Sequence, residues 1–240
     1  MKSFTPFHEI EKKLLPFISF SGSIFAIINI HIAQNISMPF KKLHAHLKEK
    51  LATFEIVTPT PFQSKSIPVI KSGMNVYCTA PKGSGKTTTL ILTTLHKLKC
   101  EAAGDAPRAV VIVENKEKAL ALHEEFLTYT KHTSLRVYVG YEQLHVDIQK
   151  SEIFEGIDIL ISTPIAMNKL LLLNGLNTSE LKIFSIDDSE FLVQKSAYTA
   201  LMSITNSIEK CQYVVYSEKM HPILKRFESH FMEYSKIVAV

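Results

Sequence analysis

The eight residues from Ala80 to Thr87, Ala-Pro-Lys-Gly-Ser-Gly-Lys-Thr, constrain the fold of this chain more than any other segment. They match the phosphate-binding loop, a glycine-rich turn between a strand and a helix, except that alanine replaces the first glycine. Gly83 and Gly85 let backbone amides approach phosphate oxygens without a Cβ in the way. The helix that follows adds the partial positive charge of its N-terminus. The loop therefore predicts a nucleotide-binding α/β domain.

Every residue of this loop is a candidate for contacting a bound nucleotide. Lys86 is expected to reach the β- and γ-phosphates and to act in catalysis, and the Thr87 hydroxyl is expected to ligate Mg²⁺. The other candidates contribute the backbone and shape of the loop, and they are Ala80, Pro81, Lys82, Gly83, Ser84 and Gly85. A chance glycine turn is the alternative, but the apolar strand before the loop and the helix after it favour phosphate binding.

Strand and helix patterns alternate along the rest of the chain. Short apolar runs predict strands, and apolar residues at helical spacing predict the helices between them. Expected strands cover 75–80, 109–113, 135–139, 157–162, 181–186 and 212–216, and expected helices cover 40–51, 63–70, 87–99, 116–129 and 167–173. This alternation is typical of a mostly parallel central sheet with helices on both faces. No linker divides residues 38–240, so we expect one α/β domain there.

A pair of carboxylates follows one of these expected strands. The run from Leu181 to Ile186 ends in Asp187-Asp188-Ser189-Glu190. This order places Asp187 at the carboxyl edge of the sheet, where α/β folds bind ligands. Asp187 is expected to hold the metal ion, and Asp188 to orient or deprotonate the attacking water. A solvated acidic turn is the structural alternative.

Composition narrows the function without deciding it. The chain has 27 basic and 23 acidic residues, giving a net charge of +4, which permits nucleic-acid binding but does not require it. Its three arginines are Arg108, Arg136 and Arg226, and the other basic residues are lysines. Because arginine suits bidentate phosphate contacts, a bound nucleic acid must be held mostly by lysines, hydroxyls and backbone amides. Three widely spaced cysteines build neither a disulfide framework nor a zinc site and favour a reducing compartment such as the cytoplasm.

Residues 1–37 differ from the rest of the chain. The stretch from Leu14 to Ala33 is rich in Ile and Phe but is interrupted by polar residues, so it is a poor membrane-spanning helix. The small-residue cleavage site that follows the apolar stretch of a signal peptide is missing here. We expect an apolar N-terminal extension that packs on the domain and no membrane association. The shift in composition also allows a reading in which translation starts at Met38.

With these motifs in view, residues 38–240 resemble the first RecA-like domain of the DEAD-box RNA helicases. Pro59-Thr-Pro-Phe-Gln63 is similar to the adenine-reading motif of that family, in which the glutamine binds the adenine edge. Phe40 stands roughly where the family has an aromatic that stacks on the base. The resemblance implies ATP and Mg²⁺ as cofactors, held by Phe40, Gln63, the loop and Asp187.

Several motifs depart from the family pattern. Asp187-Asp-Ser-Glu190 stands where the Asp-Glu-Ala-Asp signature belongs, so Asp188 is one methylene shorter than the glutamate it replaces. We therefore expect slow ATP hydrolysis. Ser217-Glu-Lys219 replaces Ser-Ala-Thr, the motif that couples hydrolysis to unwinding. Ser217 keeps the first hydroxyl of that motif, and the second is lost.

The motifs that face RNA in the family have changed further. Glu114-Asn-Lys-Glu-Lys-Ala119 replaces Pro-Thr-Arg-Glu-Leu-Ala, so Lys116 is left to supply positive charge. Thr163-Pro164 survives from Thr-Pro-Gly-Arg without its arginine. The resemblance covers one of the family's two motor domains, and the second would supply an arginine finger and half of the RNA track. We therefore expect no autonomous unwinding.

Three functions remain open on these motifs. The first is an ATP-binding protein that binds RNA or another single-stranded nucleic acid, with weak or conditional ATPase. The second is a pseudo-helicase scaffold, in which ATP is a structural ligand. In it, the open cleft face, which is the face that the family's second motor domain covers, binds a protein partner. The third, a small-molecule kinase or another P-loop enzyme, explains the loop but not the adenine-reading motif, Thr163-Pro164 and Ser217 in this order.

Overall fold

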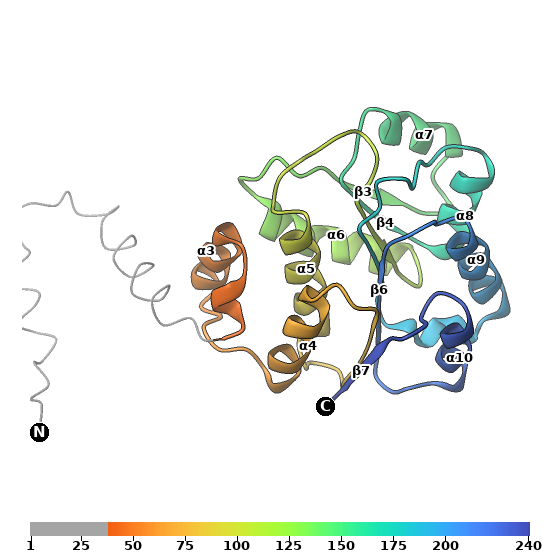
Figure 1. The fold of residues 1–240 in the computed structure, drawn as a ribbon. Helices are drawn as coiled ribbons and strands as arrows, with labels where there is room; N and C mark the ends of the chain where they lie inside the picture. The colour runs from red at the N-terminus through yellow and green to blue at the C-terminus, as the bar shows by residue number, and fades with distance from the viewer. Residues whose placement is uncertain (1–37) are drawn as a thin grey trace, which may run out of the picture.

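Seven parallel strands form one central sheet in this computed structural model, which describes residues 38–240. The strand order is β3-β4-β2-β5-β6-β1-β7, and every neighbouring pair is parallel. The strands are β1 (Val76–Thr79), β2 (Ala109–Ile112), β3 (Val137–Gly140), β4 (Ile159–Ser162), β5 (Ile183–Ile186), β6 (Gln212–Ser217) and β7 (Lys236–Ala239). The expected parallel α/β sheet is confirmed (Figure 1).

Helices cover both faces of this sheet. They are η1 (Phe40–Lys42), α3 (Ala45–Thr53), α4 (Pro61–Lys71), α5 (Lys86–Lys97), α6 (Lys116–Thr130), α7 (Val146–Phe154), α8 (Pro164–Leu172), η2 (Ser189–Val193), α9 (Lys195–Asn206), α10 (Pro222–Lys225) and η3 (Arg226–Ser229). The first core cluster joins α3, α4, α5 and α6 to one face, and the second joins α8, α9 and α10 to the other. Figure 1 shows these two layers on opposite sides of the strands.

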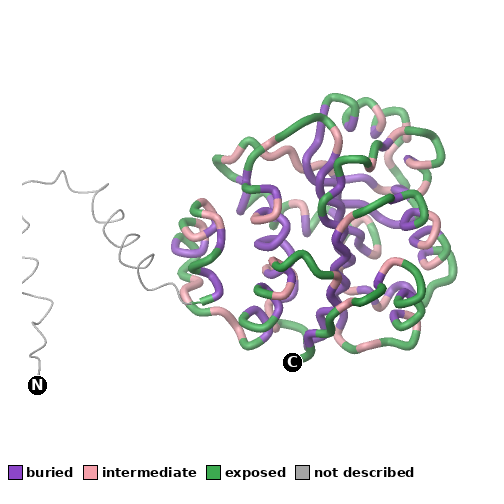
Figure 2. Tube along the Cα trace, in the orientation of Figure 1, coloured by how far each residue is buried: buried purple, intermediate pink, exposed green. Residues whose placement is uncertain are grey.

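The inner strands are apolar on both faces because each face is covered. All residues of β1, β2, β4, β5 and β6 are buried. Along β1, Val76 and Cys78 join the first core cluster, whereas Tyr77 joins the second. The buried residues accordingly run through the middle of the molecule in Figure 2. Continuous apolar runs in the sequence are the expected result of this two-sided burial.

The structure corrects some element boundaries and adds elements that the sequence patterns did not predict. The expected helix over 40–51 is divided, because Leu43 is extended (ψ 167°) between η1 and α3. Helices α7 and α9 and the edge strand β7 were not predicted. Among residues 38–240, no helix combines the length and apolar character needed to cross a membrane. The interpretations of residues 1–37 concern positions outside the described part of the chain.

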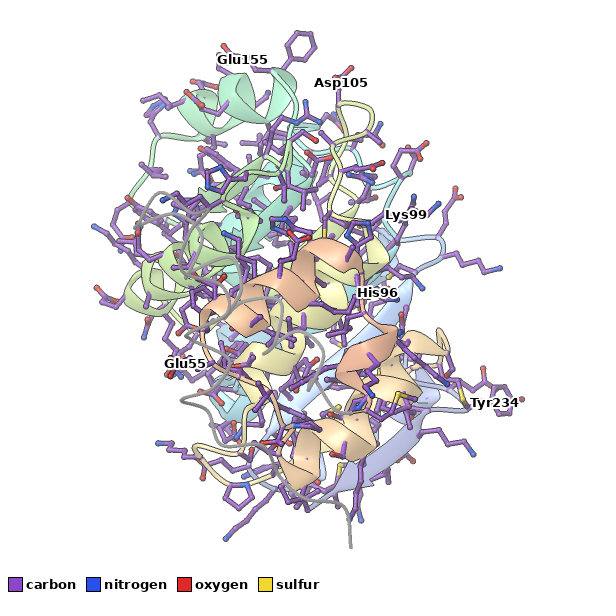
Figure 3. All side chains as sticks on the ribbon, turned by 90° about the vertical axis from the view of Figure 1, so that its left-hand side faces the viewer. Glu55, His96, Lys99, Asp105, Glu155 and Tyr234 are labelled. Carbon is purple, nitrogen blue, oxygen red and sulfur yellow. The ribbon has the colours of Figure 1, made fainter. Side chains whose placement is uncertain are left out.

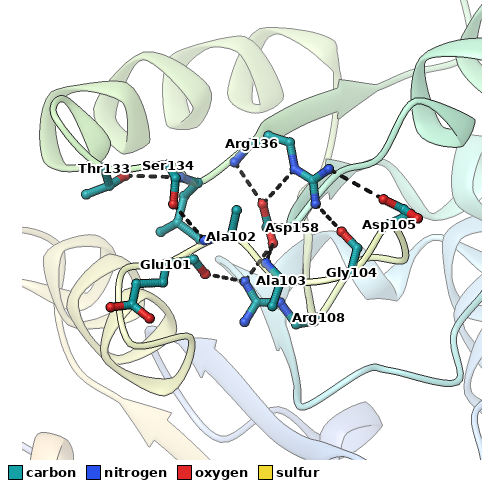
Figure 4. Close-up of polar contacts among 11 residues, drawn as sticks. Glu101, Ala102, Ala103, Gly104, Asp105, Arg108, Thr133, Ser134, Arg136 and Asp158 are labelled. Atoms are coloured by element: carbon teal, nitrogen blue, oxygen red, sulfur yellow. Dashed lines mark hydrogen bonds and ion pairs between the residues drawn. The ribbon is translucent and has the colours of Figure 1, made fainter.

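A buried ion-pair network ties together the loops at the amino edge of the sheet. Asp158, directly before β4, is fully buried and accepts hydrogen bonds from Arg108 Nη2 at 2.6 Å and from Arg136 Nε at 3.0 Å. It also accepts the backbone N–H groups of Ala103 and Arg136, each at 3.0 Å. Figure 4 shows this network. Two of the chain's three arginines are therefore structural residues at this edge.

Candidate nucleotide-binding site

The glycine-rich loop connects the carboxyl end of β1 to the first residue of α5, as the sequence predicted. Gly83 (φ 75°) and Gly85 (φ 90°) are left-handed, a conformation that other residues adopt at a cost. A Cβ at Gly85 would also lie 2.6 Å from Gln63 Nε2. Glycine is therefore required at position 85 for two separate reasons, its backbone conformation and its close neighbour.

Lys86 lies inside the curve of this loop. Its side chain is nearly buried (6% exposed), and Nζ donates hydrogen bonds to the carbonyls of Ala80 at 2.7 Å and Pro81 at 3.1 Å. Thr87, the expected Mg²⁺ ligand, follows on the first turn of α5 and is partly exposed. An ammonium held against a glycine-rich turn and a helix N-terminus suits the recognition of phosphate.

Asp187 lies at the carboxyl end of β5, two strands away from β1. Its Oδ1 atom is buried, and no hydrogen-bond partner for it exists among the described residues. Burial and the neighbouring Asp188 raise the pKa of Asp187 to about 7, against the opposing charges of Lys118 and Lys86. A buried carboxylate oxygen without a donor is costly. A cation bound to Asp187 would remove that cost.

Lys118 is a residue of this site that the sequence reading did not assign. It projects from the first turns of α6, and its Nζ lies 3.2 Å from Glu114 Oε2 and 3.4 Å from Asp188 Oδ2. Burial lowers the pKa of Lys118, but its contacts with Glu114 and Asp188 outweigh this and raise it. Asp188 itself is left-handed (φ 44°). The predicted water-activating carboxylate is therefore already paired with a cation.

The segment after β6 is bonded to the acidic segment after β5. Glu190 Oε1 accepts the backbone N–H of Glu218 at 2.5 Å. The Glu218 carboxylate in turn lies 3.5 Å from Nζ of the exposed Lys82 in the phosphate-binding loop. Ser217 Oγ, predicted to take part in coupling, is buried without a hydrogen-bond partner in the described chain. Three predicted motifs are thus in mutual contact through Glu218.

Gln63, the predicted adenine reader, is bonded to its own helix start and to the loop. Its Oε1 accepts the Thr60 N–H at 3.0 Å, while its backbone N–H donates to Thr60 Oγ1, which completes a capping box for α4. Gln63 Nε2 lies 3.5 Å from the Gly85 carbonyl, and Thr60 Oγ1 donates to the Ser84 carbonyl at 2.7 Å. The predicted adenine-reading motif therefore contacts the phosphate-binding loop directly.

The remaining predicted residues lie apart from this cluster. Phe40 is fully buried in the first core cluster, so its ring offers no free face for stacking on a base. Thr163 is also fully buried, and its hydroxyl accepts the Ala166 N–H at 3.3 Å as the N-cap of α8, with Pro164 in the first turn. Lys116 is partly exposed, with its Nζ 5.0 Å from the centre of the Tyr141 ring.

These contacts test whether the site fits a nucleotide with a metal ion. Four buried oxygens near the carboxyl ends of β1, β5 and β6 have no partner in the described chain, namely Ser84 Oγ, Asp187 Oδ1, Ser189 Oγ and Ser217 Oγ. Native proteins rarely leave so many buried polar atoms unpaired in one region. No cluster of three or more metal-binding side chains occurs within residues 38–240. Mg²⁺ is commonly held by one or two protein groups and the phosphates, so the residues present fit Mg·nucleotide.

A glycine-rich loop between an inner strand and a helix, with acids after a nearby strand, defines a P-loop α/β domain. The family model described as "DEAD/DEAH box helicase" matches residues 60–220, about two thirds of the chain, and the protein belongs to that family. The expected resemblance is thereby confirmed.

Two curated relatives illustrate the extent of the match. The probable ATP-dependent RNA helicase ddx42 of Dictyostelium discoideum is 26% identical over 185 residues, which are 75% of this chain and 19% of the relative. The ATP-dependent RNA helicase DeaD of Buchnera aphidicola subsp. Schizaphis graminum is 26% identical over 196 residues, 81% of this chain and 32% of the relative. This chain therefore spans less than a third of either relative.

A solved structure agrees on the fold. The crystal structure of a DEAD box protein from the hyperthermophile Methanococcus jannaschii superposes with a TM-score of 0.75 at 18% identity. The match covers 82% of this chain and 54% of that one. The RecA-like arrangement of a parallel sheet between helices is thereby confirmed.

Proposed function

We propose that this protein binds Mg·ATP at the phosphate-binding loop and binds single-stranded RNA, with slow hydrolysis and no unwinding of its own. The observation that carries the proposal is the buried, unpartnered Asp187 Oδ1, close enough to Lys86 and Lys118 for both cations to oppose the rise in its pKa. Thr87 and Asp187 would hold Mg²⁺, which neutralises phosphate charge when bound. Lys86 would bind the β- and γ-phosphates, and Gln63 would hold the loop in position.

The pairing of Asp188 supports slow hydrolysis. A general base must lie within hydrogen-bond reach of the proton that it removes. Asp188 is one methylene shorter than the glutamate of the family, and its carboxylate is 3.4 Å from the Lys118 ammonium. The Lys118 ammonium also occupies one of the two carboxylate oxygens that would accept the proton. Both effects act in the same direction, toward a low rate.

The proposed RNA contact rests on fewer groups. Lys116 stands beside the Tyr141 ring at the start of α6, a pairing that suits stacking and phosphate contact together. Arg108 and Arg136 are committed to Asp158 at the opposite edge of the sheet. We therefore expect weak RNA binding through lysines and backbone amides, with a shallow salt dependence because few phosphates are neutralised.

A pseudo-helicase scaffold is the second candidate, favoured by the ion pair between Lys82 and Glu218. Glu218 stands where the family has alanine, which could not form this ion pair. The pair connects the phosphate-binding loop to the segment after β6. In that function ATP would be a structural ligand and the cleft face would bind a protein partner. Free cysteines at Cys78 and Cys100 support cytoplasmic residence for either function.

The experiment that tests the proposal is a titration of the full chain with a fluorescent ATP analogue, with Mg²⁺ or with EDTA. Lys86→Ala should abolish binding, whereas Lys65→Ala should retain it, because Lys65 is exposed on α4 and lies outside the loop. Equal affinity of the wild-type and Lys86→Ala proteins would refute nucleotide binding at this loop. RNA affinity measured with and without a slowly hydrolysed analogue then separates the two functions, because coupling between the ligands must be reciprocal.

A further inference from the structure

A second cavity lies at the opposite end of α5 from the phosphate-binding loop. It has a volume of about 270 Å³ and forms where the ends of α4 and α5 meet the start of α3 and the first residue of β6. Its polar lining includes His44, Lys71, His96, Lys97, Lys99 and Gln212. Figure 3 faces this side of the molecule and labels His96 and Lys99. Helix α5 has 12 residues and is about 18 Å long, with the glycine-rich loop before its first residue and the cavity at its C-terminal half.

The lining of this cavity carries positive charge without a matching carboxylate. Lys71, Lys97 and Lys99 belong to it, and no lining residue is acidic. Each of these lysines lacks an ion pair with any residue of the described chain. Lysines at helix C-termini are common, because they compensate the helix dipole. Compensation of the helix dipole does not explain why three lysines and two imidazoles surround one cavity.

The polar groups around the cavity are held in position by the backbone. Gln212, 5% exposed, donates through Nε2 to the carbonyls of Ile70 at 2.7 Å and Met74 at 2.8 Å. This leaves Gln212 Oε1 to accept from Lys97 Nζ at 3.2 Å. The Nζ atom of Lys71 donates to the carbonyl of Lys42. The two ammonium groups are therefore placed before any ligand arrives.

The two histidines contribute a donor and an unsatisfied atom. His96 Nδ1 accepts the backbone N–H of His44 at 3.1 Å, so the proton of the neutral His96 ring is on Nε2. His44 Nδ1 is buried, and it has no hydrogen-bond partner among the described residues. Burial and the charges of Lys71, His44 and Lys97 lower the pKa of His96 to about 4. Burial and Lys42 likewise lower the pKa of Lys71. The cavity thus has a positive potential that nothing in its lining neutralises.

We propose that this cavity is a binding site for a small phosphate-bearing anion, separate from the nucleotide site. Its volume equals that of about nine water molecules at about 30 Å³ each, which accommodates one or two phosphate groups. Lys71, Lys97 and Lys99 supply charge-assisted donors, and the tautomer of His44 with its proton on Nδ1 would supply one more donor. Gln212 and Thr93 are nearly buried and their donors are bonded to backbone carbonyls, so the lysines are the main groups left to bind the anion.

The test measures binding of inorganic pyrophosphate by calorimetry, at constant ionic strength, in the full chain carrying Lys86→Ala. That substitution removes phosphate binding at the glycine-rich loop, so the remaining signal belongs to the second cavity. Adding Lys99→Glu should weaken pyrophosphate binding about tenfold or more, because a donor is replaced by a repelling carboxylate. Lys65→Glu is the matched control on α4, since Lys65 is exposed and lies outside the lining. It should change the affinity less than about twofold.

Three results would overturn the proposal. The first is the absence of saturable pyrophosphate binding in the Lys86→Ala protein. The second is an equal loss in the Lys65→Glu and Lys99→Glu proteins, which would indicate general charge attraction. The third is a response of single-stranded RNA binding to Lys99→Glu without any response of pyrophosphate, which would assign the lysines to a nucleic-acid surface. Lys97→Glu provides a second variant, from the C-terminal end of α5, should Lys99→Glu fail to fold.

Discussion

Two aspartates at opposite edges of the same sheet differ in their hydrogen bonding and in the direction in which their pKa is shifted. Asp158, at the amino edge, is fully buried and receives donors from two arginines and two backbone N–H groups. Burial would raise the pKa of Asp158, but its hydrogen bonds with Arg136, Arg108 and Ala103 outweigh burial and lower it. Asp187, at the carboxyl edge, has a buried Oδ1 without a partner in the described chain and a pKa raised to about 7.

This difference is the one expected between a structural carboxylate and a ligand-binding carboxylate. A buried carboxylate whose hydrogen bonds are complete has no capacity left for a ligand. A carboxylate kept unsatisfied makes folding less favourable, and that arrangement is typical of a binding site. The same logic applies to the basic residues. Arg108 and Arg136 are paired with Asp158, whereas Lys71 and Lys99 line a cavity that contains no carboxylate.

The largest effect on stability is expected for Asp158→Asn. This substitution leaves the buried Arg108 guanidinium without its counter-charge, so the free energy of unfolding should fall by about 3–5 kcal/mol. Denaturant unfolding measures the change. Asp105→Asn is the control within the same network, because Asp105 is 87% exposed and lies 3.9 Å from Arg136. Its effect should stay below about 1 kcal/mol, and comparable losses in both variants would contradict the assigned role of Asp158.

Asp187→Asn should have its effect on ligand binding instead. We expect the Mg²⁺-dependent part of the ATP affinity to fall by more than about tenfold, since Mg²⁺ prefers a carboxylate ligand. Stability without ligand should be unchanged or increased, because an uncompensated buried charge is removed. Nucleotide titrations in Mg²⁺ and in EDTA, with unfolding of the same protein, measure both quantities. A large loss of stability with intact Mg²⁺ dependence would show that Asp187 is a structural carboxylate and not a ligand-binding one.

Asp158 and Asp187 should also make opposite contributions to the pH dependence of the free energy of unfolding. The pKa of Asp158 is lowered by folding, so its stabilising contribution is present above the unfolded value near 3.8 and is lost as the pH falls through that region. The pKa of Asp187 is raised to about 7, so the folded state binds an extra proton between about pH 4 and 7. Its contribution therefore declines as the pH rises across that window, by at most about 1.4 kcal/mol per pH unit. Unfolding of the ligand-free Asp187→Asn protein should lack this decline, and parallel curves for both proteins would exclude it.

A smaller effect is expected for Lys118→Met. Removing this cation frees the Asp188 carboxylate, and ATP hydrolysis should rise about two- to fivefold, the equivalent of a partly exposed ion pair of about 0.5–1 kcal/mol. Steady-state phosphate release measures the rate. Lys131→Met, at the exposed C-cap of the same helix, is the control and should leave the rate unchanged. A rate that falls in Lys118→Met would show that the lysine assists the reaction.

The sequence predicted the parts of this fold that depend on local patterns. Five buried strands were predictable because two-sided burial leaves uninterrupted apolar runs such as Ala109–Ile112. Strand β7 was missed because three of its four residues are exposed, which leaves no such run. Helix α9 was predictable in principle, since Ala197, Leu201 and Ile204 recur at helical spacing and are buried.

The candidate site was predictable to the level of motifs but not of contacts. Glu114 and Lys118 have the spacing of an ion pair within a helix, yet the pairing with Asp188, 70 residues away, depends on β2 lying beside β5. The residue type and position of Phe40 in the sequence are compatible with stacking on a base. Its burial could not be predicted, because it depends on tertiary packing in a core cluster that includes Leu47. Long-range neighbours cannot be read from local spacing.

The position of β1 also has a consequence for how the protein is made. Val76 pairs with Val214 and Lys236, which lie 138 and 160 residues later in the chain. Such distant pairing must wait for synthesis and then for closure of a long loop, and it is slow compared with local contacts. During translation, the strand that carries the glycine-rich loop therefore lacks both neighbours until the last part of the domain has left the ribosome. We expect nascent chains that stop before β6 to contain the entire loop sequence and to lack a formed phosphate site.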